Sequence, residues 1–134
     1  MTTGQCLCGA LKITISGEPV AMALCHCRDC QRISGSAFGF NWVVPAAQLS
    51  VTGTPKKYTS TANSGNPVTS HFCGNCGTTL WRDGPATQGM TYVKGGMLDG
   101  ATADGVKPMA EIFTRSRVPW LHAIDGAHQK EEMV

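Results

Sequence analysis

Alternating hydrophobic and polar positions dominate this chain and predict strands rather than long helices. Leu11 to Ser16 alternates strictly between apolar and polar residues, which is typical of a strand with one buried face. The same period of two recurs in a run of large apolar residues: Phe38, Phe40, Trp42 and Val44. Further short strands are predicted at 20–24, 49–51, 56–60, 68–72, 78–82, 90–94 and 109–114. We therefore expect a mainly β protein.

Helical periodicity is confined to short segments of the chain. Helical turns are expected at 28–34, at 45–49, where proline suits the first position, and at 119–124. Turn-forming residues at 61–67 and 99–106 predict loops. We expect a single domain over residues 4–124, followed by a tail at 125–134 that frays.

Composition and charge exclude several classes of function. The net charge is +2, and the eleven Lys and Arg residues are scattered rather than gathered in the stripe expected of a nucleic-acid-binding protein. The first residues lack the features of a secretory signal, and the longest apolar run near them, 20–25, is too short to span a membrane. We expect a cytoplasmic protein with reduced thiols, without nucleic-acid or membrane partners. The sequence leaves open whether the protein forms a homo-oligomer.

All seven cysteines lie in three tight clusters, which is the strongest chemical signal in the sequence. Their odd number means that disulfides alone cannot use them all, and clustered cysteines of reducing compartments are more often metal ligands. Two distant pairs and one triplet divide into four plus three, which predicts two zinc ions per chain. The structural zinc would be held by Cys6, Cys8, Cys73 and Cys76. The catalytic zinc would be held by Cys25, Cys27 and Cys30.

A site with three thiolate ligands leaves one position of a tetrahedral zinc open. Three thiolates donate much charge, so such a zinc would activate water poorly and would suit a soft fourth ligand. A substrate thiol bound there would lose its proton and stay nucleophilic. The triplet therefore indicates an enzyme that acts on thiols. A redox dithiol is the main alternative for Cys73 and Cys76, but the βαβ context of such motifs is missing.

The cysteine motifs and their surroundings resemble the family of glutathione-dependent formaldehyde-activating enzymes. The matching segments are Gly4–Gly9, Cys25–Arg32, Ser34–Ser36, Phe72–Thr78, Leu80, Gly96–Asp99 and Pro119–Trp120. The resemblance implies a β-tent fold of packed antiparallel sheets and the same division of cysteines between a structural and a catalytic zinc. It also implies a carbon–sulfur lyase that joins glutathione and formaldehyde into S-hydroxymethylglutathione.

Two positions depart from residues that are frequent in this family. Ser70 stands where members often carry Arg, and Glu111 stands where members often carry His. Glutathione is an anion, so the loss of basic groups near the site would weaken its recognition.

A few other residues near the motifs have two interpretations each. His26 lies between two cysteines, and we expect its side chain to point away from the triplet because its neighbours point inward; a proton donor is the alternative. Arg28 and Arg32 either contact a substrate carboxylate or form a solvated helix face. The aromatic stripe at 38–42 is expected in the core, with a pocket lining as the alternative. The turn at 34–36 is either plain or an anion-binding turn.

The expected function is a zinc-dependent enzyme that joins a small aldehyde such as formaldehyde to a small thiol such as glutathione. Two alternatives come from other classes. One is a non-enzymatic zinc-binding module for protein interaction, which would need only closed metal sites. The other is a thiol-based redox or zinc sensor, whose triplet would oxidise reversibly and release zinc.

Overall fold

A small antiparallel sheet forms one part of the protein, whose computed structural model describes residues 1–101 and 106–133. Its strands lie in the order β1 (Thr2–Gln5), β2 (Lys12–Ile15) and β5 (Leu49–Thr52). The alternating pattern predicted β2 and β5. It did not predict β1, because Thr2 to Gln5 is polar and only Gly4 is buried there.

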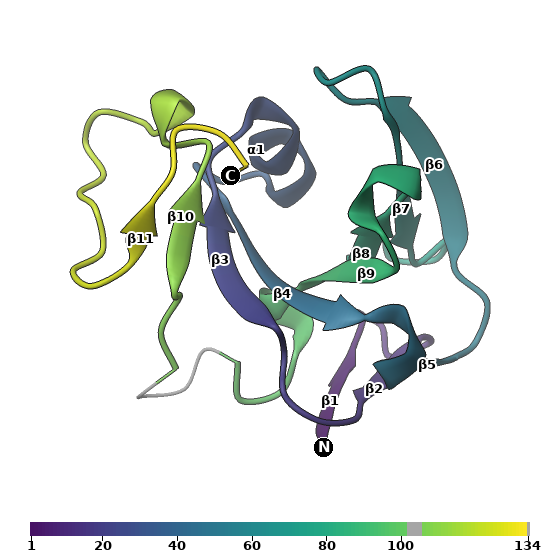
Figure 1. The fold of residues 1–134 in the computed structure, drawn as a ribbon. Helices are drawn as coiled ribbons and strands as arrows, with labels where there is room; N and C mark the ends of the chain where they lie inside the picture. Colours follow the sequence, from purple (N-terminus) through teal and green to yellow (C-terminus); the bar gives the residue numbers. More distant parts are fainter. Residues whose placement is uncertain (102–105, 134) are drawn as a thin grey trace.

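The larger sheet has eight strands and curves strongly from one end to the other (Figure 1). Their order is β11 (His128–Gln129), β10 (Ala110–Ile112), β3 (Ala21–Cys25), β4 (Gly39–Pro45), β9 (Met90–Lys94), β8 (Thr79–Asp83), β7 (Pro67–Phe72) and β6 (Lys56–Thr61). Neighbouring strands are antiparallel from β3 to β6. β10 is parallel to both of its neighbours, so the predominantly antiparallel sheet is mixed at this edge.

A short helix, α1 (Arg28–Ser34), connects β3 to β4. It begins where the Cys27 side chain accepts a hydrogen bond from the backbone of Cys30, and it ends at Gly35 in the left-handed conformation. Four 3-10 turns follow at Ala46–Gln48, Pro85–Thr87, Gly95–Met97 and Thr114–Ser116. The helical turn expected at 119–124 is only a tight turn, closed by the Leu121 amide on the Val118 carbonyl. Among the described residues, no helix has the length and apolar character needed to cross a membrane.

The hydrophobic core lies between the two sheets and defines the expected mainly β, tent-like arrangement. Ile13 and Ile15 of β2 and Val44 and Val93 of the larger sheet are almost completely buried in one cluster. Trp42 joins this cluster, whereas Phe38 and Phe40 remain partly exposed. The aromatic stripe is therefore divided between the core and the surface.

The end of the chain is paired in the structure rather than frayed. β11 lies beside β10, and the amide of Lys130 donates to the carbonyl of Glu111. Polarity alone suggested a free tail, because His128 and Gln129 are polar and exposed, but the Gln129 side chain also donates to Glu111 Oε2 and to the Ala127 carbonyl. The loop expected at 99–106 lies partly outside the described residues.

Val93→Ala tests the position of the core. Val93 is completely buried between the two sheets, so the substitution leaves a cavity and is expected to lower the free energy of unfolding by about 2 kcal/mol. Val20→Ala is the matched control, because Val20 is 59% exposed. Urea denaturation of both variants measures the difference, and equal stabilities would contradict this packing.

Candidate metal centres

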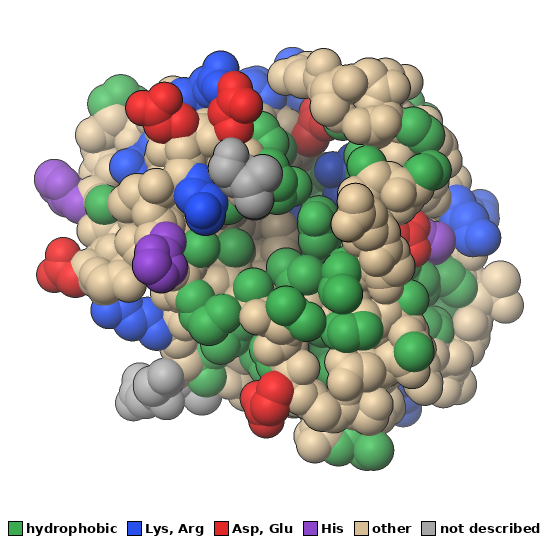
Figure 2. All heavy atoms as spheres, in the orientation of Figure 1, with side chains coloured by type: hydrophobic (Ala, Val, Ile, Leu, Met, Phe, Trp, Pro, Cys, Tyr) green, Lys and Arg blue, Asp and Glu red, His purple; other side chains and the backbone are tan. Residues whose placement is uncertain are grey.

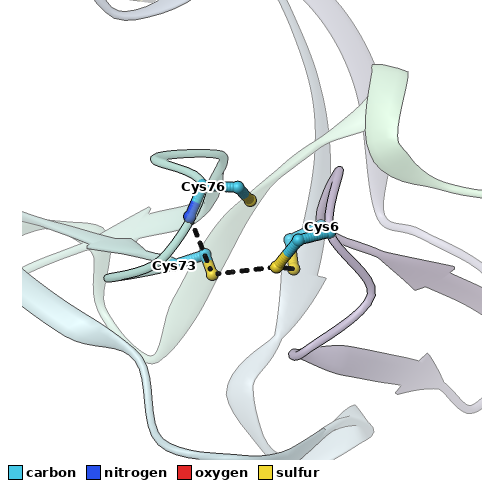
Figure 3. Close-up of side chains that lie close together, drawn as sticks. Cys6, Cys73 and Cys76 are labelled. Atoms are coloured by element: carbon cyan, nitrogen blue, oxygen red, sulfur yellow. Dashed lines mark hydrogen bonds between the residues drawn. The ribbon is translucent and has the colours of Figure 1, made fainter.

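Two loops from different sheets bring four thiols together. Cys6 and Cys8 follow β1, and Cys73 and Cys76 follow β7 in a tight knuckle (Figure 3). The Cys8 sulfur lies 3.6 Å from the Cys6 sulfur and 3.7 Å from the Cys73 sulfur. We call these four residues the four-cysteine cluster. It joins segments that are 65 residues apart in the sequence.

Backbone amides surround the sulfurs of the four-cysteine cluster. The amide of Leu11 donates to the Cys6 sulfur at 3.3 Å and lowers the pKa of that thiol. The amides of Asn75 and Cys76 donate to the Cys73 sulfur at 3.4 and 3.5 Å. The hydroxyl and amide of Thr78 lower the pKa of Cys76 to about 5. These amides and the hydroxyl favour thiolates, which are the form that binds metal. At Cys73 the two amides are outweighed by burial and by the thiols of Cys76 and Cys6, so the pKa of Cys73 is raised overall without a metal.

The geometry of the four-cysteine cluster fits a tetrahedral metal ion. All four sulfurs lie within 4.8 Å of one another, and all seven cysteines of the chain are free thiols. Sulfurs at about 2.3 Å from a tetrahedral zinc would be separated by roughly 3.8 Å. The two measured sulfur–sulfur distances, 3.6 and 3.7 Å, are close to that value. This cluster could therefore hold a metal ion.

The second group of thiols lies where β3 passes into α1. Cys25 is the last residue of β3, Cys27 precedes the helix, and Cys30 lies in its first turn. Their three sulfurs also lie within 4.8 Å of one another, and Cys25 and Cys30 are buried. We call them the three-cysteine cluster. It could hold a metal ion with one position left for another ligand.

The three thiols do not ionise alike in the absence of a metal. Contacts with Cys27 and Cys30, together with burial, raise the pKa of Cys25. The pKa of Cys30 is lowered, first by its contacts with the other two thiols and then by the cations of Lys94 and Arg82. The cluster therefore favours one thiolate before any metal binds.

A cleft of about 680 Å³ is lined by Cys6 of the four-cysteine cluster and by residues that follow the three-cysteine cluster in the chain. On the face of the molecule drawn in Figure 2, hydrophobic side chains gather near the centre and a hollow lies above them. Gly39 lies at the wall nearest to the three-cysteine cluster. A Cβ atom at that position would lie 3.4 Å from the Cys30 sulfur and 3.7 Å from Lys94 Nζ. The absence of a side chain at Gly39 therefore lets the wall of the cleft lie close to Cys30 and Lys94. Other parts of the wall are formed by Leu7, Thr78, Ile33, Phe38, Phe40 and Asp99.

His26 points away from the three-cysteine cluster, into a buried network centred on Glu111. His26 is completely buried and its Nε2 lies 2.8 Å from Glu111 Oε1. Glu111 Oε2 accepts from the Ile124 amide at 2.9 Å and from Gln129 Nε2 at 2.7 Å, and it lies 3.2 Å from Arg117. Glu111 thus connects the cysteine loop to the C-terminal segment, residues 113–133.

Burial alone would raise the pKa of Glu111, but its hydrogen bonds reverse that effect. The amide of Ile124, the Gln129 side chain and His26 lower the pKa of this carboxyl from 4.5 to about 2. Because the folded-state pKa is depressed, the carboxylate stabilises the fold above its ordinary pKa. That contribution is lost as the pH falls through about 2.

The other residues considered in the sequence analysis lie in places that do not involve the two clusters. Arg28 and Arg32 lie on the exposed face of α1, where Arg28 contacts Gln31. The turn at 34–36 is an ordinary helix end, in which the Ser34 hydroxyl donates to the Phe38 carbonyl at 2.9 Å. His71, which lies outside the cysteine motifs, is buried, stacks on Trp81 and contacts Asp83 at 2.8 Å.

Two basic residues near the three-cysteine cluster were missed by the sequence analysis. Arg82 of β8 is opposite Ser70 of β7, and its Nε donates to the Ser70 hydroxyl at 3.0 Å. A guanidinium group therefore lies beside position 70 although the residue there is serine. Lys94 ends β9, and its Nζ donates to Asn41 Oδ1 at 2.9 Å. Only the register of β4, β9 and β8 brings both cations to one face, which no local motif indicates.

Together, the fold and the two cysteine clusters define a small β protein with the donor sets of two metal centres. The family model for glutathione-dependent formaldehyde-activating enzyme matches residues 1–116, and the chain belongs to this family. A comparison with curated protein sequences found no match.

One solved structure with a similar fold is that of a Rhodobacter sphaeroides protein determined as a structural genomics target. It has 20% sequence identity and a TM-score of 0.57, and the match covers 73% of this chain and 88% of that one. At this level of identity the similarity concerns the fold.

The two clusters are expected to respond differently to the loss of one thiol. Cys73→Ser should destabilise the fold by several kcal/mol, because the four-cysteine cluster closes a long loop between the two sheets. Cys27→Ser should leave a folded protein with one metal ion fewer, because that cluster lies within a single turn. Thermal unfolding and metal analysis compare the variants. Equal destabilisation would assign a structural role to both clusters.

Glu111→Gln tests the buried network. The substitution keeps the size of the side chain but removes its charge, so Arg117 and His26 lose their anionic partner. We expect the free energy of unfolding to fall by about 3 kcal/mol at pH 7. Glu18→Gln, at an exposed position, serves as the control. Chemical denaturation that gives the same midpoint for both variants would contradict a stabilising network.

Proposed function

We propose that the protein is a zinc-dependent carbon–sulfur lyase that joins formaldehyde, or a similar small aldehyde, to glutathione or a related thiol. The observation that carries this proposal is the convergence of the three thiols of Cys25, Cys27 and Cys30 next to a cleft. Family membership supports the choice of substrates. Seven free thiols suit a reducing compartment, so we propose the cytoplasm as the location.

Zinc suits the all-sulfur donor sets of both clusters. In this proposal the four-cysteine cluster holds a structural zinc and the three-cysteine cluster holds a catalytic one, giving two ions per chain. When bound at the three-cysteine cluster, zinc would supply a soft position that keeps a thiol deprotonated and nucleophilic.

Residues of the cleft would control access to the reacting sulfur. Gly39 brings the wall of the cleft close to Cys30, and the half-buried rings of Phe38 and Phe40 provide apolar walls. In the reaction the substrate sulfur attacks the carbonyl carbon of the aldehyde. A sulfur–carbon bond forms, the carbonyl π bond breaks, and the oxygen takes up a proton in place of the one that the thiol released.

Exchange NMR tests the reaction directly. The zinc-loaded protein should increase the rate of exchange between free and hydroxymethylated glutathione above the rate measured without protein. Cys27→Ser should reduce this increase at least about 100-fold, because it removes one of three ligands. Arg32→Gln, an exposed change on the same helix, is the control and should behave as the wild type.

Two results would contradict the proposed function. One is an exchange rate that zinc-loaded protein leaves unchanged. The other is an equal increase by the wild type and by folded Cys27→Ser protein, because the three-cysteine cluster would then be irrelevant to the reaction.

A further inference from the structure

We propose that Lys94 and Arg82 form a carboxylate-binding subsite beside the three-cysteine cluster, which selects thiols that carry a negative charge. This inference deepens the proposed function, on which it rests, by naming the residues that recognise the rest of the thiol substrate. It concerns the chemistry of a carboxylate, such as those of glutathione, held a few ångströms from the reacting sulfur.

The register of the large sheet places both cations on the same face as the three-cysteine cluster. Cys25 pairs with Gly39, and two residues further along β4 Asn41 pairs with Lys94. Two residues before Lys94, Tyr92 pairs with Arg82. Because paired residues and alternate residues share a face, these side chains all lie on the face opposite the core residues Trp42 and Val93.

Neither cation has a carboxylate partner within residues 1–101 and 106–133. Arg82 is only 8% exposed, and its contacts are the hydroxyl groups of Ser70 at 3.0 Å and Ser60 at 3.5 Å. Lys94 is half-buried and contacts the neutral amide of Asn41. The negative charge near them is that of the three-cysteine cluster, whose Cys30 thiolate interacts with both cations. Charged groups removed from water are costly unless an opposite charge is close. A ligand carboxylate beside the cluster would therefore meet two cations that no carboxylate of the described chain occupies.

The position of Lys94 directs this site toward the substrate. Lys94 lines the cleft, and its Nζ and the Cys30 sulfur both lie within 4 Å of the point where a Cβ atom of Gly39 would stand. A ligand in the cleft that approaches the cluster past Gly39 therefore lies beside the ammonium group. The guanidinium of Arg82 presents a planar set of donors that matches a carboxylate.

Calorimetry on the zinc-loaded protein with a pair of matched thiols tests this subsite. The probes are 3-mercaptopropionate and its neutral amide, 3-mercaptopropionamide, which differ only in the charged group. The wild type should bind the acid about tenfold or more tightly than the amide, since a charge-assisted hydrogen bond is lost with the amide. Lys94→Met and Arg82→Met should lose this preference while keeping their affinity for the amide.

The control variants separate charge from folding. Arg32→Met removes an exposed cation from α1 and should keep the full preference for the acid. Lys94→Arg and Arg82→Lys keep the charge and should retain most of the preference for the acid. If Arg82→Met does not fold, Lys94→Met, at a half-buried position, decides the matter.

The possible failures are distinguishable. Equal binding of the acid and the amide to the wild type, or a preference that survives in both methionine variants, overturns the subsite and leaves the proposed function standing. An equal loss of affinity for both probes in the variants also overturns it, because the cations would then act on the sulfur rather than on the carboxylate. If neither thiol binds to the wild type, the proposed function and the subsite are overturned together.

Discussion

The architecture depends on the meeting of two loops at the four-cysteine cluster. One loop leaves the small sheet after β1 and the other leaves the large sheet after β7, and the sulfurs of Cys8 and Cys73 approach to 3.7 Å between them. The Leu7 amide also donates to the Thr78 hydroxyl, so the same two loops are joined outside the thiols. The cleft lies beside this junction and includes Leu7 and Thr78 in its walls. Its shape is therefore fixed by the contact that holds the sheets together.

The large sheet uses its two faces for different purposes. One face packs Trp42, Val44 and Val93 against the small sheet and supplies the core. The other face carries Cys25, the cations of Lys94 and Arg82, and the side of Gly39 that lies against Cys30. A change of register by one residue would move every side chain of a strand to the opposite face. The buried apolar residues of the core thus also keep the polar residues of the candidate site in place.

Local sequence signals were sufficient for most strands, for α1 and for the three-cysteine cluster. The grouping of Cys6, Cys8, Cys73 and Cys76 is not local, since it came from dividing seven cysteines into four plus three. The alternation at Leu11 to Ser16 and the spacing of Cys25, Cys27 and Cys30 are local features, and they depend little on distant parts of the chain. Features made by pairing between distant segments were not accessible. β11 is only two residues long, and its partner is about eighteen residues away. The positions of Arg82 and Lys94 depend on the order of three strands, and the surroundings of Glu111 depend on a tail that looked too polar to pack.

The contacts of Glu111 have a consequence for how the two ends of the network influence each other. The same carboxylate binds His26 in the cysteine loop and Gln129 in the C-terminal segment, and Gln31 of α1 donates to the carbonyls of both His26 and Ser116. Ordering of the loop and docking of the segment are therefore linked equilibria, and linkage is reciprocal. If a ligand of the loop stabilises the docked state of the segment by a certain free energy, docking of the segment strengthens binding of that ligand by the same free energy.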